Sequence, residues 1–383
     1  MIFIKLIEEL KPEILNIFQH LHENPEISWE ERQTTKYISR ILEKNGLEVK
    51  QFDDIPGVIG TWSPNEGERN ITVGIRADMD ALFQEVNGSF RANHSCGHDA
   101  HMAIVVGVLL LLKKLKAVLS GTVKFIFQPA EEVGEGALKM IEKQVLRDVD
   151  FLYGVHLRPI QELKYGQASS GIIHGATTTF FGKIHGFDGH AAKPHLTVNA
   201  IEVIAAIVEQ IKGIHLDPLV PYSVKMTHVS AGNSTNANII PGSAKFSLDL
   251  RAQTNEAMEQ LIEKVNQIIK GLATLYQCEL TIEQKGRVYA AVVNPQAKRL
   301  LAKAIEDTLG LEGLVDPIMT PGGEDFHFYT KEKPTIKATM LGLGCDLAPG
   351  LHHPNMSFNH NALFVGIEII TRAVLETFSK NDK

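Results

Sequence analysis

Residues 102–128, MAIVVGVLLLLKKLKAVLSGTVKFIFQ, join an apolar stretch of helical length to a short run rich in β-branched and aromatic residues. A similar short run precedes it at 70–78, NITVGIRAD, and another follows at 150–156, DFLYGVH. Runs that are apolar almost throughout and that alternate with helices are typical of parallel strands buried on both faces. The pattern predicts an α/β domain with a largely parallel sheet flanked by helices.

The chain is longer than one hydrophobic core usually serves. It has 383 residues, whereas single cores stop growing at roughly 250–300 residues. Between residues 174 and 285 the strand-like runs alternate or carry Thr and Ser, which suits an antiparallel sheet with one solvated face. Amphipathic helices are expected at 199–214 and after a Thr254 cap. We therefore expect a small α+β domain at 174–285, inserted into a larger domain formed by 1–173 and 286–383.

Composition excludes several classes of protein. The formal charge is −7 and no basic stripe is visible, so a nucleic-acid partner is not expected. The longest apolar run, Met102–Leu112, reaches about half of the ~20 residues that a membrane span needs. The amino-terminal segment carries Glu8 and Glu9 and lacks a small-residue cleavage site, so it is expected to be a helix and not a signal peptide. Three scattered cysteines form no disulfide framework. These features predict a cytoplasmic protein.

Side chains that can bind metals occur at strand ends and at one helix start. In open α/β sheets, ligands bind beyond the carboxyl ends of the strands. Thiolate, imidazole and carboxylate groups that converge on one such edge are typical of a transition-metal site, here one with two ions. The segments concerned are Asp78 and Asp80, NHSCGHDAH at 93–101, Glu131 and Glu132, His156, and LHHPNMSFNH at 351–360, which holds His352, His353 and His360.

Each of these signals has an ordinary structural explanation when it is taken alone. Glu131 and Glu132 could be a solvated loop edge, and Cys96 a small buried residue. His156 could be a satisfied core histidine, Asp78 and Asp80 could cap a turn, and His352 and His353 could be an exposed loop pair. Five separate places nevertheless end a strand or begin a helix with ligand-type residues. Their coincidence favours a metal site.

The same segments resemble the aminoacylase/hippurate hydrolase family of co-catalytic metallopeptidases. This branch includes plant indole-acetyl-amino acid hydrolases and bacterial N-acyl-amino acid deacylases. The similarity covers essentially the whole chain, in matching order and at similar spacing. It rests on RADMDAL (76–82), HSCGHDAH (94–101), FIFQPAEEVGEGA (125–137), GVHL (154–157), GHAAKPHLTVNAI (189–201), NIIPGSAKFSLDLR (238–251), GGEDF (322–326) and LHHP (351–354).

The resemblance implies a metallopeptidase domain with an inserted lid and dimerisation domain. It also implies two divalent transition-metal ions, Zn, Mn, Co or Ni, with Cys96 shared between them. Of the two adjacent histidines, the family spacing before proline favours His352 over His353. The implied metal ligands are Cys96, His98, Glu132, His156 and His352.

Further residue roles follow from the same resemblance. Glu131 is implied as the general base, and Asp80 as the carboxylate that orients a metal ligand from behind. His190 is implied to reach the active site of a partner subunit and to stabilise the oxyanion. Arg251 and Asn238 match positions that bind the substrate. The sequence departs from the family pattern at one place. Phe83 replaces the family's proline and the loop that follows is shorter, so the wall of the substrate pocket is expected to differ while the metal ligands do not.

The expected activity is therefore metal-dependent hydrolysis of the amide bond of N-acyl amino acids by a homodimer, with Glu131 as general base and acid. The first alternative is a dipeptidase or carboxypeptidase on the same scaffold. The second is a binding protein that has lost turnover.

Overall fold

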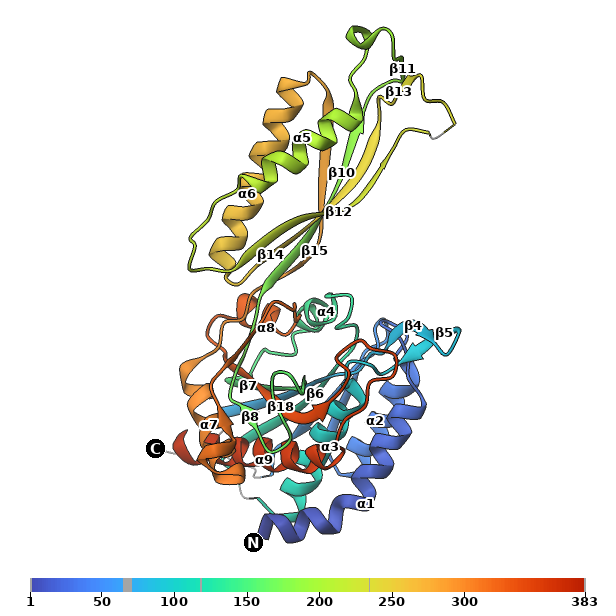
Figure 1. Ribbon diagram of the computed structural model, residues 1–383. Coiled ribbons are helices and arrows are strands. Elements are labelled where there is room, and N and C mark those ends of the chain that lie inside the picture. Colours follow the sequence, from blue (N-terminus) through green and yellow to red (C-terminus); the bar gives the residue numbers. More distant parts are fainter. Residues whose placement is uncertain (1, 65–70, 118, 234, 382–383) are drawn as a thin grey trace. The chain divides into compact units, whose positions relative to one another are not determined.

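The computed structural model describes residues 2–64, 71–117, 119–233 and 235–381 (Figure 1). The chain forms two compact units. Unit 1 comprises residues 1–173, 292–319 and 325–383, and unit 2 comprises residues 174–291 and 320–324. The expected insertion ended at residue 285, which lies inside a strand (Glu279–Val288); unit 2 continues to Ala291.

Unit 1 is built on an eight-stranded sheet in the order β1-β2-β6-β3-β7-β18-β8-β16. Its centre, β6-β3-β7-β18, is parallel, while β1 and β2 run antiparallel at one side. The carboxyl ends of the central strands therefore meet at one edge. The strands are β1 (Glu48–Gln51), β2 (Val58–Trp62), β3 (Ile71–Asp78), β6 (Gly121–Gln128), β7 (Phe151–Pro159), β8 (Ala168–Ser169), β16 (Leu314–Val315) and β18 (Lys337–Leu347).

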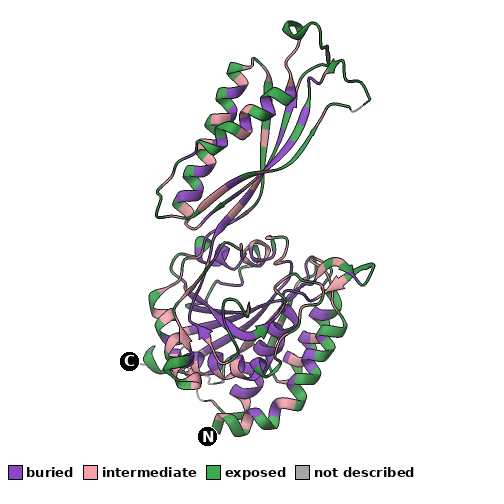
Figure 2. Ribbon diagram, in the orientation of Figure 1, coloured by how far each residue is buried: buried purple, intermediate pink, exposed green. Residues whose placement is uncertain are grey.

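Helices cover this sheet, and the central one supplies much of the core. Helix α3 packs against α1 and α9, and nearly its whole length is buried (Figure 2). It begins at His98 and not at residue 102 as its apolar run suggested, because Gly97 adopts a left-handed φ of 88° and turns the chain into the helix. The helices are α1 (Ile2–Glu23), α2 (Arg32–Lys44), α3 (His98–Lys114), α4 (Gly136–Glu142), α7 (Pro295–Leu309), α8 (His327–Glu332) and α9 (Asn361–Asn381).

Shorter elements complete unit 1. Strands β4 (Leu82–Val86) and β5 (Ser89–Asn93) form a hairpin in the segment where the family proline is missing. Strands β9 (Ile172–His174) and β17 (Ile318–Thr320) form a second pair, and η2 (Leu311–Gly313) is a single 3₁₀ turn. Among the described residues, no helix is both long enough and apolar enough to cross a membrane.

Unit 2 is an α+β unit with an antiparallel sheet in the order β12-β14-β10-β15. Buried residues alternate with more exposed ones along β10, so one face of the sheet is buried, as the sequence pattern predicted. The expected Thr254 cap is present, because its side chain accepts a hydrogen bond from the Ala257 amide. The elements are β10 (Ala176–His185), β11 (Gly189–His190), η1 (Pro194–Leu196), α5 (Ala200–Lys212), β12 (Tyr222–Ala231), β13 (Ile239–Ile240), β14 (Ala244–Ala252), α6 (Asn255–Leu275) and β15 (Glu279–Val288).

Candidate metal centre

The candidate site lies at the carboxyl edge of the unit 1 sheet. Asp78 ends β3, Gln128 ends β6 just before the Glu131–Glu132 pair, and His156 lies near the end of β7. These three strands are neighbours in the sheet. Because they are parallel, side chains that follow their carboxyl ends collect at one edge. The amino end of α3 completes the arrangement.

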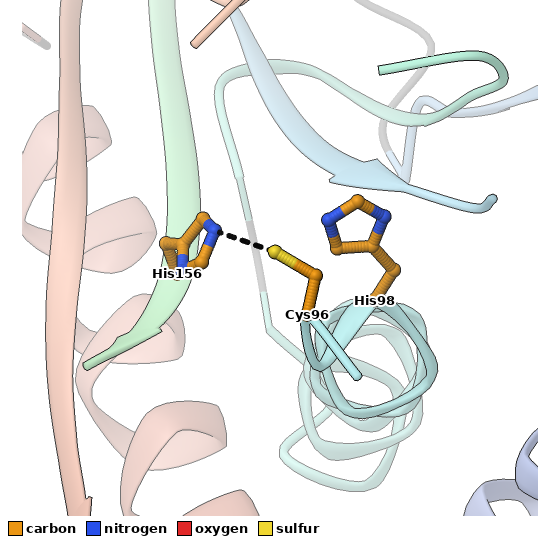
Figure 3. Close-up of side chains that lie close together, drawn as sticks. All are labelled: Cys96, His98 and His156. Atoms are coloured by element: carbon orange, nitrogen blue, oxygen red, sulfur yellow. Dashed lines mark hydrogen bonds between the residues drawn. The ribbon is translucent and has the colours of Figure 1, made fainter. Parts of the chain in front are cut away.

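Cys96, His98 and His156 are all buried and face one another (Figure 3). The distance from Cys96 Sγ to His156 Nε2 is 3.7 Å. His156 Nδ1 lies 2.7 Å from the Leu157 carbonyl oxygen. Because a carbonyl only accepts, Nδ1 carries the hydrogen and the lone pair of Nε2 points toward Cys96. This tautomer suits a metal ligand.

Asp80 connects three parts of the site. Its carboxylate lies 3.2 Å from His98 Nδ1 and accepts hydrogen bonds from Ser28 Oγ at 2.7 Å and from the Glu132 amide at 3.0 Å. The bond to His98 Nδ1 leaves Nε2 of that ring directed away from Asp80. Although burial favours its neutral form, these hydrogen bonds keep the pKa of Asp80 below its usual value. Asp80 therefore has the position of a carboxylate that orients a metal-binding histidine.

Glu132 and His352 lie on another side of Cys96 and complete the cluster. His352 Nε2 lies 3.4 Å from Glu132 Oε1, and both side chains group with Cys96. The nearby Cys96 thiol and Glu132 carboxylate raise the pKa of His352 to about 10. The neighbouring His353 is exposed, and its Nδ1 accepts a hydrogen bond from the Asn355 amide at 3.1 Å. Of the two histidines, His352 is the one that the structure brings to the cluster.

Glu131 lies beside these groups with a different orientation. Its Oε2 is 4.0 Å from His98 Nε2, and its Oε1 accepts a hydrogen bond from the Asp325 amide at 3.4 Å. Its side chain keeps 11% exposure, so water can reach it. A carboxylate at the rim of a ligand cluster can accept a proton from a water molecule placed between them.

The polar atoms of the cluster fit divalent cations. Within the described residues, the buried atoms His98 Nε2 and Glu132 Oε1 have no hydrogen-bond partner, an arrangement that is costly without a ligand. Burial, together with the charge of Glu132, raises the pKa of the Cys96 thiol. A bound cation would stabilise the thiolate form of Cys96 against this effect of burial.

Cys96 also links two potential ligand groups. It belongs to one group with His98 and His156 and to another with Glu132 and His352. The structure thus brings together all five side chains that the sequence pointed to. A thiol, three imidazoles and a carboxylate suit Zn²⁺ and similar ions better than Mg²⁺ or Ca²⁺.

A buried network behind the cluster was not recognised from the sequence. His101 accepts the Leu157 amide hydrogen at Nε2, so its Nδ1–H donates to Asp78 Oδ1 at 2.6 Å. Arg76 is fully buried and bridges Asp78 and Asp325 at 2.6 and 2.9 Å. Asp325, in the GGEDF motif, also accepts from the Ala137 amide at 2.8 Å. These residues hold the strand ends in register with the Glu131 loop.

Three expected substrate-site residues belong to unit 2. His190 and Asn238 are exposed on adjoining segments, joined by a hydrogen bond from the Ala191 amide to the Asn238 carbonyl at 2.9 Å. Arg251, on β14, pairs with Asp249 at 2.9 Å and donates to the Pro321 carbonyl at 3.2 Å. The three residues are thus placed within their own unit.

Comparison with known proteins decides the family. Residues 74–376 match the model of "Peptidase family M20/M25/M40". The chain belongs to this family. An IAA-amino acid hydrolase of Arabidopsis thaliana, ILR1-like 4, is 33% identical to it, over 84% of this chain and 75% of the plant protein. Thermostable carboxypeptidase 2 of Saccharolobus solfataricus is 31% identical, over 86% and 85% of the two chains.

A solved structure of an M20 protein is also similar. The Bacillus subtilis protein described as a dinuclear metal-binding peptidase superimposes with a TM-score of 0.82 at 28% identity, over 97% of this chain and 99% of that one. The resemblance read from the sequence motifs is thereby confirmed, as is the α/β class. As a member of the M20 family, this protein is a metallohydrolase that acts on amide bonds.

Proposed function

We propose that this M20 hydrolase cleaves the amide bond of N-acyl amino acids, with Glu131 as the general base. The observation that carries the proposal is the position of Glu131 beside a cluster of potential metal ligands: Cys96, His98, Glu132, His156 and His352. A relative named as an IAA-amino acid hydrolase acts on a compound of this class, and it supports the substrate assignment.

The chemistry follows from the residues of the site. Cys96, His98, Glu132, His156 and His352 would hold two divalent ions, which would supply Lewis-acid polarisation of the scissile carbonyl and make water at the site more acidic. Glu131 accepts the proton of the attacking water and returns it to the leaving amine. Asp80 fixes the ring of His98 during this exchange through its contact with Nδ1. We propose Zn²⁺, Mn²⁺, Co²⁺ or Ni²⁺ as the ion, because the ligand set is rich in nitrogen and sulfur.

We propose that Arg251 recognises the α-carboxylate of the substrate. A cavity of 150 Å³ in unit 2 is lined by Arg251 together with Tyr222, Ser223 and Pro321. The guanidinium is already held by Asp249 and the Pro321 carbonyl, so its planar fork is oriented before a ligand arrives. Guanidinium groups bind carboxylates through two parallel hydrogen bonds. We propose the same substrate-binding role for Asn238, which the resemblance implies together with Arg251.

We further propose that the active form is a homodimer in which His190 of one subunit serves the other's metal centre. Strand β12 is an edge of the unit 2 sheet, and such edges invite pairing with a second copy. A groove of 580 Å³ beside it is lined by apolar residues, among them Val208, Ile211, Met226 and Val229. An imidazole donor directed at the developing oxyanion stabilises the transition state.

The cytoplasm is the proposed location. All three cysteines are free, and Cys96 must remain a thiol to act as a ligand. Reducing compartments maintain that state.

Hydrolysis of matched substrate pairs tests the substrate class. Purified protein with added Zn²⁺, Mn²⁺ or Co²⁺ should release the amino acid from N-acetyl and N-benzoyl amino acids faster than from dipeptides of the same carboxyl-terminal residue. Preference for dipeptides would instead support the carboxypeptidase alternative, which the Saccharolobus relative represents. Turnover of neither class by metal-loaded protein would favour the binding protein that has lost turnover.

The carboxylate contact has its own test. Methyl esters of the same N-acyl amino acids should be hydrolysed more slowly than the free acids, because an ester cannot accept the two charge-assisted hydrogen bonds that the Arg251 guanidinium offers to a carboxylate. Arg251→Lys should weaken hydrolysis of the free acid and reduce the difference between acid and ester. Equal hydrolysis of acids and esters by the wild-type protein would rule out this role of Arg251.

A further inference from the structure

Glu31 directly precedes α2, yet its side chain does not cap that helix. The amides of Gln33 and Thr34 are instead bound by the carboxylate of Glu26, at 3.1 and 2.8 Å. No capping hydrogen bond from the Glu31 side chain is found, and Glu31 is fully buried. Because Glu26 already caps α2, the buried carboxyl group of Glu31 has a hydrogen-bond partner elsewhere.

That partner is the backbone of the loop that carries the hydrolytic glutamates. Glu31 Oε1 accepts a hydrogen bond from the Ala130 amide at 2.7 Å, across 99 positions of sequence. Ala130 directly precedes Glu131 and adopts a left-handed φ of 54°, which alanine rarely takes. Its carbonyl accepts from the Gly136 amide at 3.1 Å. The peptide groups on both sides of the strained residue are therefore fixed, one of them by Glu31.

The strained residue sets the direction of the two glutamates that follow it. A left-handed residue turns the chain sharply, so the Glu131 and Glu132 side chains leave the loop on the side of the cluster. Backbone strain of this kind persists only where surrounding contacts enforce it, and it concentrates at functional sites. The Glu31 contact is one such enforcing contact.

The chemistry of the Glu31 carboxyl group suits this use. Burial, and next the charge of Asp80, raise the pKa of Glu31 to about 8. Its second oxygen, Oε2, is buried without a hydrogen-bond partner among the described residues. Burying an oxygen without a hydrogen-bond partner costs less free energy for a protonated carboxyl group than for a charged carboxylate. An amide side chain of the same shape would offer Ala130 the same carbonyl acceptor.

We propose that Glu31 is a positioning residue of the hydrolytic site, which holds the Ala130 amide so that Glu131 and Glu132 are presented to the metal centre. The inference rests on the proposed role of Glu131, and it adds a residue from the amino-terminal segment to the machinery of the site. Glu31 contacts neither substrate nor metal, and it acts through the loop that begins at Ala130.

Three variants and one control separate positioning from folding. At saturating metal, Glu31→Ala should lower kcat by about 10²-fold with KM nearly unchanged, because a shift of ~1 Å in a reacting group costs about that much. Glu31→Asp, which shortens the side chain by one methylene, should do the same and serves if the alanine variant fails to fold. Glu31→Gln should restore turnover near the wild-type value. Glu30→Ala removes an exposed neighbouring acid and should change nothing.

A second measurement needs no substrate. Hydrogen–deuterium exchange at the Ala130 amide should be slow in the wild-type protein, Glu31→Gln and Glu30→Ala, and faster in Glu31→Ala and Glu31→Asp. If the wild-type protein hydrolyses no N-acyl amino acid, the proposed function fails while this readout still tests the inference. Wild-type turnover or wild-type exchange in both Glu31→Ala and Glu31→Asp would overturn it. So would a loss in Glu31→Gln as large as in Glu31→Ala.

Discussion

Glu131 and Glu132 are adjacent in sequence but have different surroundings. Glu132 groups with Cys96 and His352, and its Oε1 is buried without a hydrogen-bond partner among the described residues. Glu131 is held by the Asp325 amide at the rim. Glu131→Gln should therefore reduce turnover by roughly 10²–10⁴-fold, the usual contribution of a general base, with metal content unchanged. Glu132→Gln should instead lower metal content. Elemental analysis beside steady-state kinetics checks both, and an empty site in Glu131→Gln would reverse the two assignments.

The raised pKa of Glu31 also predicts a pH dependence of stability. The folded state holds this proton up to about pH 8, whereas the usual pKa is 4.5. The stabilisation is complete below the usual pKa and is lost as pH rises toward 8, at up to about 1.4 kcal/mol per unit. Glu31→Gln removes this loss, so its melting temperature relative to the wild-type protein should rise between pH 5 and pH 8. A difference that stays constant over this range would contradict the buried neutral acid.

The residues around the metal centre could be predicted from the sequence, whereas some buried acids that support them could not. Part of the site was predictable because Asp80 follows one recognisable strand and His156 lies near the end of another, and the family resemblance supplied the ligand set. Glu31 and Asp325 were missed because their partners are distant: Glu31 binds Ala130 across 99 positions, and Asp325 binds Arg76 across 249. A buried acid has no period or spacing that separates it from a surface acid. Of the adjacent His352 and His353, the resemblance already favoured His352, and the structure brings that side chain to Glu132 and Cys96.

At the scale of elements, the close packing of α3 on α9 depends on a missing side chain. A Cβ atom at Gly107 would lie 2.2 Å from Ile367 Cδ1, and both residues are buried. Gly107→Ala should therefore destabilise the protein by about 1–3 kcal/mol, because a packed core tolerates added atoms poorly. Ile367→Val should recover part of this loss.

An exposed helical glycine provides the matched control for Gly107. A Cβ atom at Gly271 of α6 meets nothing within 4 Å. Gly271→Ala should stabilise the protein by roughly 0.5–1 kcal/mol through helix propensity alone. Urea unfolding of the two variants gives the comparison. Stabilisation by Gly107→Ala would mean that the two helices are not packed as described.

Long periodic elements were predictable, and short ones were not. The amino-terminal helix α1, the apolar helix α3 and the buried runs of β3, β6 and β7 lie where the sequence pattern placed them. The start of α3 was placed late, because the predicted helix followed the apolar run and His98 to His101 are polar. The β4–β5 hairpin and edge strand β1 lack a clear pattern, and tertiary pairing decides them.

At the scale of the whole molecule, the proposed dimer makes a distinct prediction. His190→Ala and Glu131→Gln proteins should each be nearly inactive alone. Mixed under conditions that exchange subunits, they should regain part of the activity, since one metal centre of each heterodimer would have an intact Glu131 and a partner's intact His190. Verified heterodimers without recovered activity would mean that His190 acts in its own subunit or has no catalytic part.

The dependence of hydrolysis on two metal ions is tested by titrating metal-free protein with Zn²⁺ or Co²⁺, with bound metal and N-acyl amino acid hydrolysis measured at each step. No hydrolysis is expected in excess chelator, and full activity is expected only as two ions bind per chain. Cys96→Ala should lose both tight binding and turnover, because Cys96 belongs to both ligand groups. Full turnover in excess chelator, or in protein that holds no metal, would show that hydrolysis does not depend on the metal centre.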